Sequence, residues 1–216
     1  INQIKSSLQD HPHDIAAIII EPIQGEGGDN HFRDEFMTSL RQICDENEMM
    51  FIMDEVQTGV GITGKWWAHE HFTSKPDIIA FGKKAQVCGI LSSNRVDEVK
   101  QNVFSESSRI NSTFGGNLTD MVRFQLILEI ITDENLLENA KKMGDILLTG
   151  IRDLEVEFPA FVTNARGLGL FAAFDLPSPT ERDRLISKLI ENKVMILPSG
   201  DQSVRFRPHL NVIEED

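Results

Sequence analysis

The chain has 216 residues and a net charge of −13, with 25% charged and 40% hydrophobic residues. This is the composition of a globular protein, and the excess of acid argues against nucleic-acid binding because no basic patch could neutralise phosphates. No apolar run approaches the roughly 20 residues of a membrane span and no signal peptide is evident, so we expect a cytoplasmic protein whose two cysteines stay reduced.

The two ends of the sequence predict a fragment. Ile1 stands where an initiator methionine would be, and an acidic run, residues 214–216, directly follows a strand-like segment. We expect part of the domain, and with it part of any site, to lie outside this chain.

Strands and helices alternate in the first part of the chain. The apolar run at residues 15–23 predicts a buried parallel strand, and apolar residues at helical spacing predict an amphipathic helix over residues 34–48. Residues 49–56 form a second buried strand, and this order implies a right-handed parallel crossover. Residues 78–81 and 89–92 are two further short strands.

Two helices and a change of composition follow. Residues 117–131 are apolar on two faces, which predicts a buried helix, and residues 136–151 have the spacing of a long amphipathic helix. Composition changes near residue 158. We therefore assign residues 1–158 to the C-terminal part of a large domain and residues 159–216 to the start of a smaller α+β domain.

The smaller domain begins with strands between residues 167 and 175, followed by a helix. Ser178 is a capping hydroxyl for that helix, Pro179 lies in its first turn, and Glu181 completes a capping box.

A carboxylate at the end of a strand is the first candidate site residue. Asp54 follows a run of apolar residues, so it lies at the carboxyl edge of a central strand, where open α/β sheets bind ligands. A helix cap or a solvated acid is the plainer interpretation. A buried acid needs a cationic partner, and a protonated pyridine nitrogen would serve. Gln57 could then reach the oxygen on the ring, and Val56 could press on one face.

A lysine follows the next strand. Lys83 comes after an apolar run and Gly82, and desolvation there would favour the neutral, nucleophilic amine. Lys84 competes for this role. An acid for a pyridinium nitrogen and a lysine for the aldehyde are the two groups that pyridoxal phosphate requires of a protein.

Two other patterns are weaker. Residues 59–66 nearly spell a phosphate-binding loop, but a tryptophan stands where the magnesium-binding hydroxyl is needed, so a nucleotide binder is a minor alternative. His11 with His13, and His69 with His71, lack the spacing of a zinc helix and have no thiol cluster beside them. We expect no metal site.

Four stretches together resemble the class III (ω-) aminotransferases of fold type I: residues 21–28, 54–59, 76–83 and 166–170. Within the class, residues 81–89 and 111–123 are similar to the branch that acts on L-lysine. The 4-aminobutyrate aminotransferases are the nearest alternative. They share residues 26–31 and 67–71, but they resemble the two discriminating stretches less. The resemblance implies an α/β fold with a mostly parallel sheet.

The resemblance also implies roles for individual residues. Lys83 would hold pyridoxal phosphate covalently and move the proton, while Asp54 would keep the pyridine nitrogen protonated. Val56 and Gln57 would contact the ring and its oxygen. Thr113 would bind the cofactor phosphate of a partner subunit, which implies a homodimer.

Substrate binding is implied for a second group of residues. Arg205 would bind the α-carboxylate of 2-oxoglutarate or glutamate, for which a planar guanidinium is suited, with Arg207 as the alternative binder. Both point to the same face of a strand, so spacing does not separate them. Glu26 would mask the arginine in one half-reaction and move away in the other, with Gly25 and Gly27 giving the loop freedom.

We therefore expect transfer of the ε-amino group of L-lysine to 2-oxoglutarate, giving glutamate and 2-aminoadipate 6-semialdehyde. Transfer from 4-aminobutyrate or another ω-amine is the alternative within the class. A different class of alternative is a non-catalytic domain, because the cofactor-phosphate loop, the ring-stacking aromatic and the second arginine of the family cannot be found before Ile1.

Overall fold

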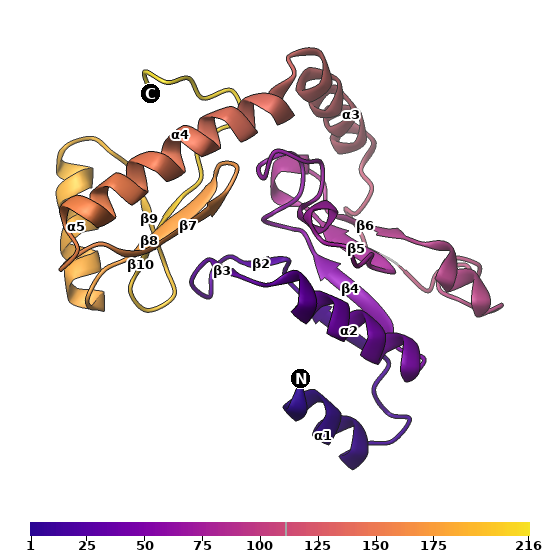
Figure 1. Ribbon diagram of the computed structural model, residues 1–216. Helices are drawn as coiled ribbons and strands as arrows, with labels where there is room; N and C mark the ends of the chain where they lie inside the picture. The colour runs from indigo at the N-terminus through magenta and orange to yellow at the C-terminus, as the bar shows by residue number, and fades with distance from the viewer. Residues whose placement is uncertain (111) are drawn as a thin grey trace. The chain divides into compact units, whose positions relative to one another are not determined.

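The computed structural model describes residues 1–110 and 112–216 (Figure 1). These residues form two compact units, and each unit is assembled from segments that are separated in the sequence. The first consists of Ile1–Pro22, Phe32–Gln57 and Ala68–Ile127; the second consists of Ile23–His31, Thr58–Trp67 and Leu128–Asp216.

A four-stranded sheet forms the centre of the first unit. In spatial order its strands are β1 (Ala17–Ile20), β4 (Met50–Asp54), β5 (Ile78–Phe81) and β6 (Gly89–Ser92). The first three are parallel and β6 is antiparallel to β5. The two short strands expected at residues 78–81 and 89–92 are confirmed. The parallel arrangement puts the carboxyl ends of β4 and β5 side by side.

The run at residues 15–23 differs from its prediction as a single buried strand. It divides into β1 and the first residue of β2 (Ile23–Gln24), which belongs to the second unit. Within β1, Ile19 keeps 64% of its surface exposed. β1 is the outer strand of the described sheet, and the described residues leave Ile19 largely uncovered.

The core of the first unit lies between α2 (Asp34–Glu46) and the sheet (Figure 1). The predicted amphipathic helix is confirmed, and its apolar face carries Met37, Leu40 and Cys44 against Phe51 and Met53 of β4. Burying a side chain of this size stabilises the fold by about 1.5–3 kcal/mol. Burial also raises the pKa of the Cys44 thiol. Both cysteines are free.

Two helices of this part of the chain depart from the predictions. α1 (Asn2–Asp10) is not predicted and has no buried residue. α3 (Leu118–Asp133) is predicted as a buried helix, yet Ile131 is its one buried residue. Leu118 is 82% exposed and Val122 57% exposed. The buried-helix prediction is therefore wrong for the described chain, because an apolar face predicts burial but not which molecule covers it.

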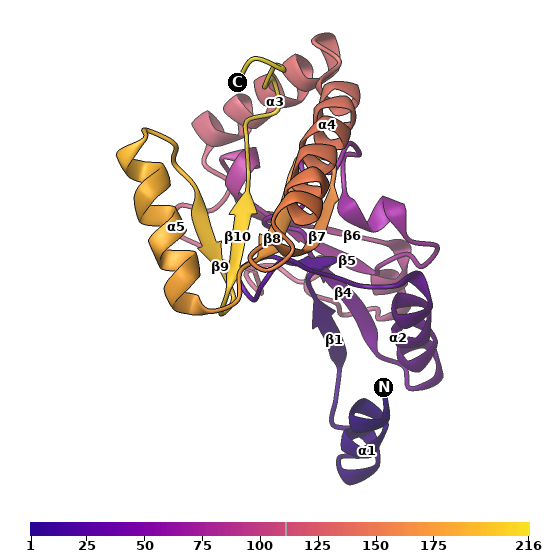
Figure 2. The same cartoon turned by 60° about the vertical axis from the view of Figure 1, so that its left-hand side comes forward.

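An antiparallel sheet forms the second unit (Figure 2). Its strands in spatial order are β7 (Thr163–Leu168), β8 (Phe171–Asp175), β10 (Ser203–Phe206) and β9 (Leu197–Ser199). α4 (Leu136–Glu157) and α5 (Pro179–Glu191) cover its apolar face, where Ile151 and Leu185 meet Phe174 and Val204. The Ser178 hydroxyl accepts a hydrogen bond from the Glu181 amide at 3.2 Å, which confirms the predicted cap.

A second core in this unit joins α4 to a loop and to the C-terminal segment. Ile62, Ala140, Met143 and Leu170 pack together there. The backbone of Gly169 lies so close to Gly144 of α4 that a methyl group on Gly144 would lie 2.2 Å from it. Residues 58–63 are all buried, and Ile62 belongs to this core.

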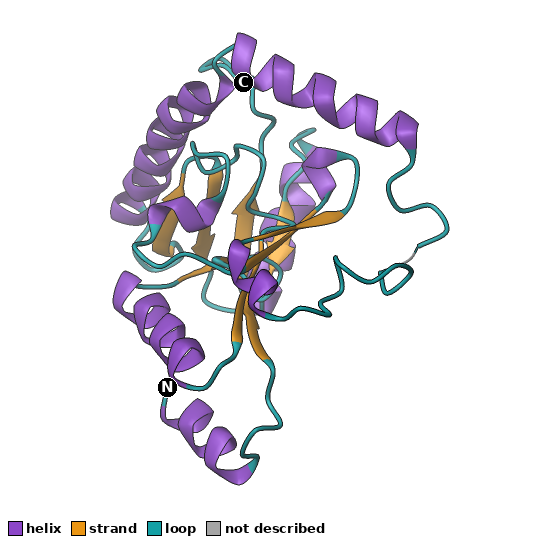
Figure 3. Cartoon of the chain, turned by 90° about the vertical axis from the view of Figure 1, so that its right-hand side faces the viewer, coloured by secondary structure: helices purple, strands orange, loops and turns teal. Residues whose placement is uncertain are grey.

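Short elements complete the described chain (Figure 3). They are β3 (Asn30–His31), which pairs with β2, and the 3₁₀ turns η1 (Ala68–His71), η2 (Lys83–Ala85) and η3 (Asn94–Glu98). Within residues 1–110 and 112–216, no helix is long and apolar enough to cross a membrane. The predicted boundary near residue 158 lies at the end of α4, inside the second unit, and the assignment of residues 1–158 and 159–216 to two domains stays a prediction.

Candidate functional site

The carboxyl ends of β4 and β5 bring Asp54 and the Lys83 turn to one edge of the first unit. Asp54 is the last residue of β4 and pairs with Ala80 of β5, three residues before Lys83. The following amide, that of Glu55, donates to the Ala80 carbonyl at 2.8 Å. This edge is where parallel α/β sheets bind ligands.

Val56 and Gln57 reach the same edge. The two methyl groups of Val56 lie 3.7 and 3.8 Å from the position that a Cβ would take on Gly82. Lys84 donates a hydrogen bond from its ammonium group to the Gln57 carbonyl. The turn after β4 is thus joined to the turn that carries Lys83, and the structure brings together four of the residues that the sequence singles out.

Lys83 and Lys84 differ in what their side chains contact. Lys83 is exposed and has a left-handed backbone, with φ of 48°. Its amine makes no hydrogen bond or ion pair with a described residue, whereas the amine of Lys84 is bonded to Gln57. The prediction that Lys83 is desolvated is wrong within this chain. Of the two lysines, Lys83 has the side chain that is open to a ligand.

Asp54 and its neighbour Glu55 have different partners. Asp54 is half-buried, and one of its oxygens accepts from the Val56 amide at 3.0 Å. Glu55 is 1% exposed and accepts from the amides of Ala68 and His69 at 2.9 and 2.7 Å. It also contacts His69 Nδ1 at 3.0 Å. Sequence reasoning misses Glu55, which fixes the start of η1.

In the second unit, three residues form a row across the sheet. Arg166 on β7 and Arg205 on β10 both pair with Ala173 on the strand between them. Directly opposed residues of neighbouring strands project to the same face. This face is polar and also carries Asp175 and Ser203, which pair with each other in the strand register.

Glu26 and Arg205 form an ion pair on this polar face. Arg205 Nη1 donates to Glu26 Oε2 at 2.7 Å. The arginine side chain is 12% exposed and the glutamate side chain 75% exposed. Because the Glu26 carboxylate is largely exposed, it can be hydrated by solvent when its side chain leaves Arg205.

Arg207 occupies a different environment. Its Nη2 donates to Asp29 Oδ1 at 2.6 Å, and its guanidinium lies 3.2 Å from the centre of the Phe171 ring. Asp29 is fully buried. Burial raises the pKa of Asp29, and the nearby guanidinium of Arg207 opposes that rise. Breaking such a buried pair costs about 3–5 kcal/mol, so Arg205 is the arginine that a substrate can recruit.

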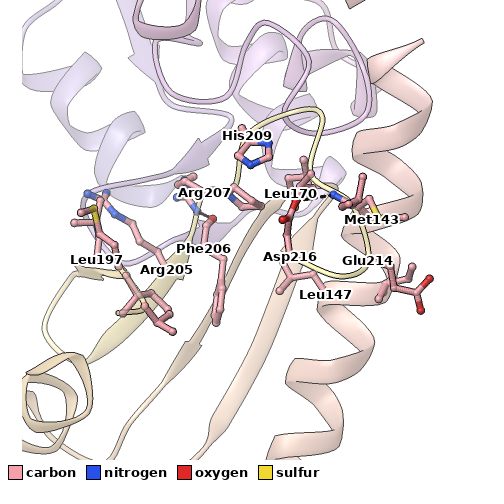
Figure 4. Close-up of a pocket in the computed structure, with 17 residues that line it drawn as sticks. Met143, Leu147, Leu170, Leu197, Arg205, Phe206, Arg207, His209, Glu214 and Asp216 are labelled. Atoms are coloured by element: carbon pink, nitrogen blue, oxygen red, sulfur yellow. Dashed lines mark hydrogen bonds between the residues drawn. The ribbon is translucent and has the colours of Figure 1, made fainter. Parts of the chain in front are cut away.

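A pocket of about 540 Å³ lies beside α4 and the C-terminal segment (Figure 4). Met143, Leu147 and Phe206 are among its apolar walls, and the two arginines, Arg205 and Arg207, also line it. Glu214 and Asp216 add acidic groups to the same walls. The mixture of charges does not favour a dicarboxylate, and we assign the pocket no role in the site.

The remaining predicted positions lie elsewhere. Thr113 is exposed and far in sequence from the groups above, and Asn111, which belongs to one discriminating stretch, lies outside the described residues. Among the described residues no cluster of three or more His, Cys, Asp or Glu could hold a metal ion. The loop at residues 59–66 folds on itself, with the Val60 and Gly61 amides donating to Trp66, so these amides do not point at a phosphate.

The described groups fit pyridoxal phosphate. Asp54 keeps a carboxylate oxygen that makes no hydrogen bond within the described part of the chain, and Lys83 offers an unengaged amine at the neighbouring strand end. An acid for the pyridine nitrogen and an amine for the aldehyde are what the cofactor requires. The parallel sheet and these side chains match the fold type I class of pyridoxal-phosphate proteins.

Comparison with known proteins identifies the family. The model of the family described as Aminotransferase class-III matches residues 1–216, and the chain belongs to this family, whose members depend on pyridoxal phosphate. The chain is 51% identical over 212 residues to an L-lysine-epsilon aminotransferase from Mycobacterium tuberculosis, covering 98% of the chain and 47% of the relative. A protein of the same name from Streptomyces clavuligerus is 47% identical over 203 residues, covering 94% and 44%.

A more distant relative is the mitochondrial 4-aminobutyrate aminotransferase of Sus scrofa, which is 41% identical over 198 residues, covering 91% of the chain and 38% of the relative. Among solved structures, lysine aminotransferase from M. tuberculosis in the internal aldimine form matches with a TM-score of 0.97 at 51% identity, covering 99% of this chain and 49% of that one. The chain thus spans about half the length of the curated relatives that it matches.

Proposed function

We propose that this chain is part of an aminotransferase that transfers the ε-amino group of L-lysine to 2-oxoglutarate, giving glutamate and 2-aminoadipate 6-semialdehyde. The observation that carries the proposal is the pairing of Asp54 with Ala80, three residues before Lys83, at one sheet edge. Identity of 51% and 47% to lysine aminotransferases, against 41% to a 4-aminobutyrate aminotransferase, supports lysine as the amine.

In the first unit, each residue has a distinct proposed task. When bound, pyridoxal phosphate supplies an electron sink for the charge that forms on the substrate carbon. Lys83 holds the cofactor through its amine and moves the proton on that carbon. Asp54 keeps a proton on the pyridine nitrogen, and Val56 and Gln57 contact the ring and its oxygen.

In the second unit, Arg205 binds the α-carboxylate of the keto acid or of glutamate. Glu26 neutralises Arg205 while the ω-amine reacts, because that end of the substrate brings no carboxylate, and it moves away when one arrives. Their 2.7 Å ion pair supports this assignment, as does the exposure of the glutamate. The engagement of Arg207 with buried Asp29 argues against Arg207 in the role.

We also propose a homodimer, in which Thr113 serves the cofactor phosphate of the partner. Its support is the exposed apolar stripe of α3, formed by Leu118, Val122, Leu126 and Ile130 at helical spacing. A second copy of the chain would bury this stripe. A cytoplasmic location remains part of the proposal, in keeping with two free cysteines.

The first experiment tests cofactor attachment in the complete protein. Pyridoxal phosphate should produce a yellow species that borohydride fixes to the peptide containing Lys83. Lys83→Ala should abolish the attachment, and Lys84→Ala is the matched control that should retain it. Attachment at Lys84, or none at all, would contradict the proposal, and the second result would favour a non-catalytic domain.

The second experiment identifies the amine. Glutamate formed from 2-oxoglutarate is measured with L-lysine, ornithine and 4-aminobutyrate as donors. The proposal predicts the highest kcat/KM for L-lysine. A higher value for 4-aminobutyrate would retain the enzyme class and overturn the substrate.

A further inference from the structure

We propose that Arg166 is a positioning residue for the gate formed by Glu26 and Arg205. Arg166 fixes the backbone of residues 25–29 on the polar face of the β7–β8–β10 sheet, so that Glu26 leaves and rejoins Arg205 by rotation of its side chain alone. This inference rests on the proposed function, in which that pair opens and closes.

The first support is that every backbone carbonyl of residues 25–29 accepts a hydrogen bond. The carbonyl of Gly25 accepts from the Ser199 hydroxyl at 2.6 Å, and that of Glu26 accepts from the Gly200 amide at 2.9 Å. The carbonyl of Gly27 accepts from the Asn30 side chain at 3.2 Å. The glycines suggest a mobile loop, yet this backbone is bonded throughout.

Arg166 supplies the last two of these bonds. Its Nη2 donates to the Gly28 carbonyl at 2.6 Å and its Nε to the Asp29 carbonyl at 2.9 Å. The same Nη2 lies 2.8 Å from Asp175 Oδ1 and 2.8 Å from the Ser203 hydroxyl, which are both on the sheet. One guanidinium therefore bonds the loop to two strands at once.

Arg166 is also correctly placed to set the position of Glu26 relative to Arg205. Both arginines pair with Ala173, whose small side chain separates them on one face of the sheet. Glu26, which contacts Arg205, lies in the loop that Arg166 bonds, two residues before Gly28. A shift of the loop would therefore move the Glu26 carboxylate away from Arg205.

Close packing against Gly200 restricts the movement of this loop from another side. Gly200 has φ of 51°, and a Cβ on it would lie 2.9 Å from the Gly28 Cα and 3.1 Å from the Gly27 carbonyl oxygen. The loop has no room to move toward β9. The substitution Gly200→Ala would therefore displace the loop without touching Arg166.

Exposure separates the moving part from the fixed part. The side chains of Arg166 and Asp175 are 12% and 14% exposed, so their bonds are costly to break. The Glu26 side chain is 75% exposed. The freedom required by the gate is thus confined to the rotatable bonds of one glutamate.

The test compares two half-reactions in the complete, cofactor-loaded protein. Single-turnover rates are measured with L-lysine and with glutamate for Arg166→Lys, which keeps the charge but loses the planar set of donors. We expect the lysine rate to fall about tenfold to a hundredfold more than the glutamate rate, in the same direction as in Glu26→Ala. Gly200→Ala should give the same asymmetry. Arg152→Met, at an exposed position on α4, is the control and should leave both rates unchanged.

Hydrogen exchange provides a readout that does not depend on turnover. The amides of Gly28 and Asp29 donate to the Gly25 carbonyl, and they should exchange faster in Arg166→Lys than in the wild type. Equal losses in both half-reactions, or unchanged exchange over residues 25–31, would overturn the inference while leaving the proposed function intact. A wild-type protein that binds no cofactor would instead overturn the proposed function.

Discussion

At the end of β4, two adjacent carboxylates differ in how many described groups they bond. Glu55 is enclosed, and its oxygens accept from the first amides of η1. Asp54 stays at the sheet edge with one amide as its partner among the described residues. Consecutive residues project to opposite sides of a strand end. Of the two, Asp54 is therefore the carboxylate that fits the proposed contact with a ring nitrogen.

Substitution of Asp54 should reduce the rate far more than substitution of Gln57. Asp54→Ala removes the carboxylate that keeps the ring nitrogen protonated, and we expect kcat to fall about a hundredfold or more. Gln57→Ala removes a neutral contact and should cost about tenfold or less. The rates are measured after cofactor content has been equalised. Small and equal losses in both variants would count against the assignment of Asp54.

His31 should make stability depend on pH in the weakly acidic range. Packing around the ring and the positive charges of Arg166 and Arg207 lower its pKa from 6.5 to about 4, even though part of the side chain is exposed. The unfolded chain therefore binds a proton below pH 6.5, while the folded chain stays neutral down to about pH 4. Stability is lost as the pH falls through this interval.

The measurement compares the wild type with His31→Gln. The unfolding free energy of the variant should fall less steeply between pH 6.5 and pH 4, because one proton-binding step has been removed. All other titrating groups are common to both proteins and cancel in the difference. Parallel curves for the two proteins would show that His31 titrates alike in the folded and unfolded chains.

Some of the residue pairs could be foreseen from the sequence, and others could not. Asp54 and Lys83 end neighbouring apolar runs, so parallel pairing predicts that they meet. Spacing predicts that Arg205 and Arg207 share a face of one strand and cannot rank them, although β10 ends at Phe206 in the structure. Their partners separate them in the structure, because Arg205 is paired with exposed Glu26 whereas Arg207 is bonded to buried Asp29, a residue 178 positions away in the sequence. Local patterns contain no information on that partner.

At the scale of elements, short apolar runs bounded by turns were sufficient to predict β5 and β6, and the capping box was sufficient to predict the start of α5. The burial of α3 was not predictable in the same way. Its outer face, with Leu118 and Val122, is as apolar as a core helix. Periodicity reports which face is apolar, and it does not report whether the same chain covers that face.

Replacement by alanine should have opposite effects on stability at two glycines of α4. A Cβ on Gly144 would lie 2.2 Å from the backbone carbon of Gly169, so Gly144→Ala must displace backbone and should destabilise the protein by about 1–3 kcal/mol. Gly150 has no atom within 4 Å of the same position. Gly150→Ala should therefore stabilise the helix by up to about 1 kcal/mol.

Denaturant unfolding of the two variants checks this pair. Each is the same change on the same helix, so helix propensity contributes equally to both. The difference between them reports the contact between α4 and the β7–β8 turn. Equal effects would mean that the turn relaxes away from α4 without cost.

At the scale of the whole molecule, the two compact units do not follow the order of the sequence. Residues 23–31 and 58–67 belong to the second unit, although the segments before and after each of them belong to the first. A single boundary near residue 158, predicted from composition, cannot describe two units whose segments alternate along the chain. The return of residues 25–29 to a sheet formed some 140 residues later depends on side chains such as Arg166, which were visible in the sequence only as part of a motif.

The exposed stripe of α3 leads to a prediction about assembly. Val122 is 57% exposed at its centre, between Leu118 and Leu126. If a second copy covers the stripe, Val122→Arg buries an unpaired charge in the interface, which costs several kcal/mol and shifts the protein from dimer to monomer. The molar mass in solution, measured over a range of protein concentrations, reports that shift.

Val156→Arg is the matched control, because Val156 is an 81% exposed valine on α4, outside any apolar stripe. It should leave the molar mass unchanged. Monomers formed by Val122→Arg should also lose activity if Thr113 serves the partner's cofactor. An unchanged dimer would remove α3 from the interface. A variant that unfolds with no change in subunit number would assign the stripe to another segment of the same polypeptide, because a charge buried within one subunit destabilises its fold rather than its assembly.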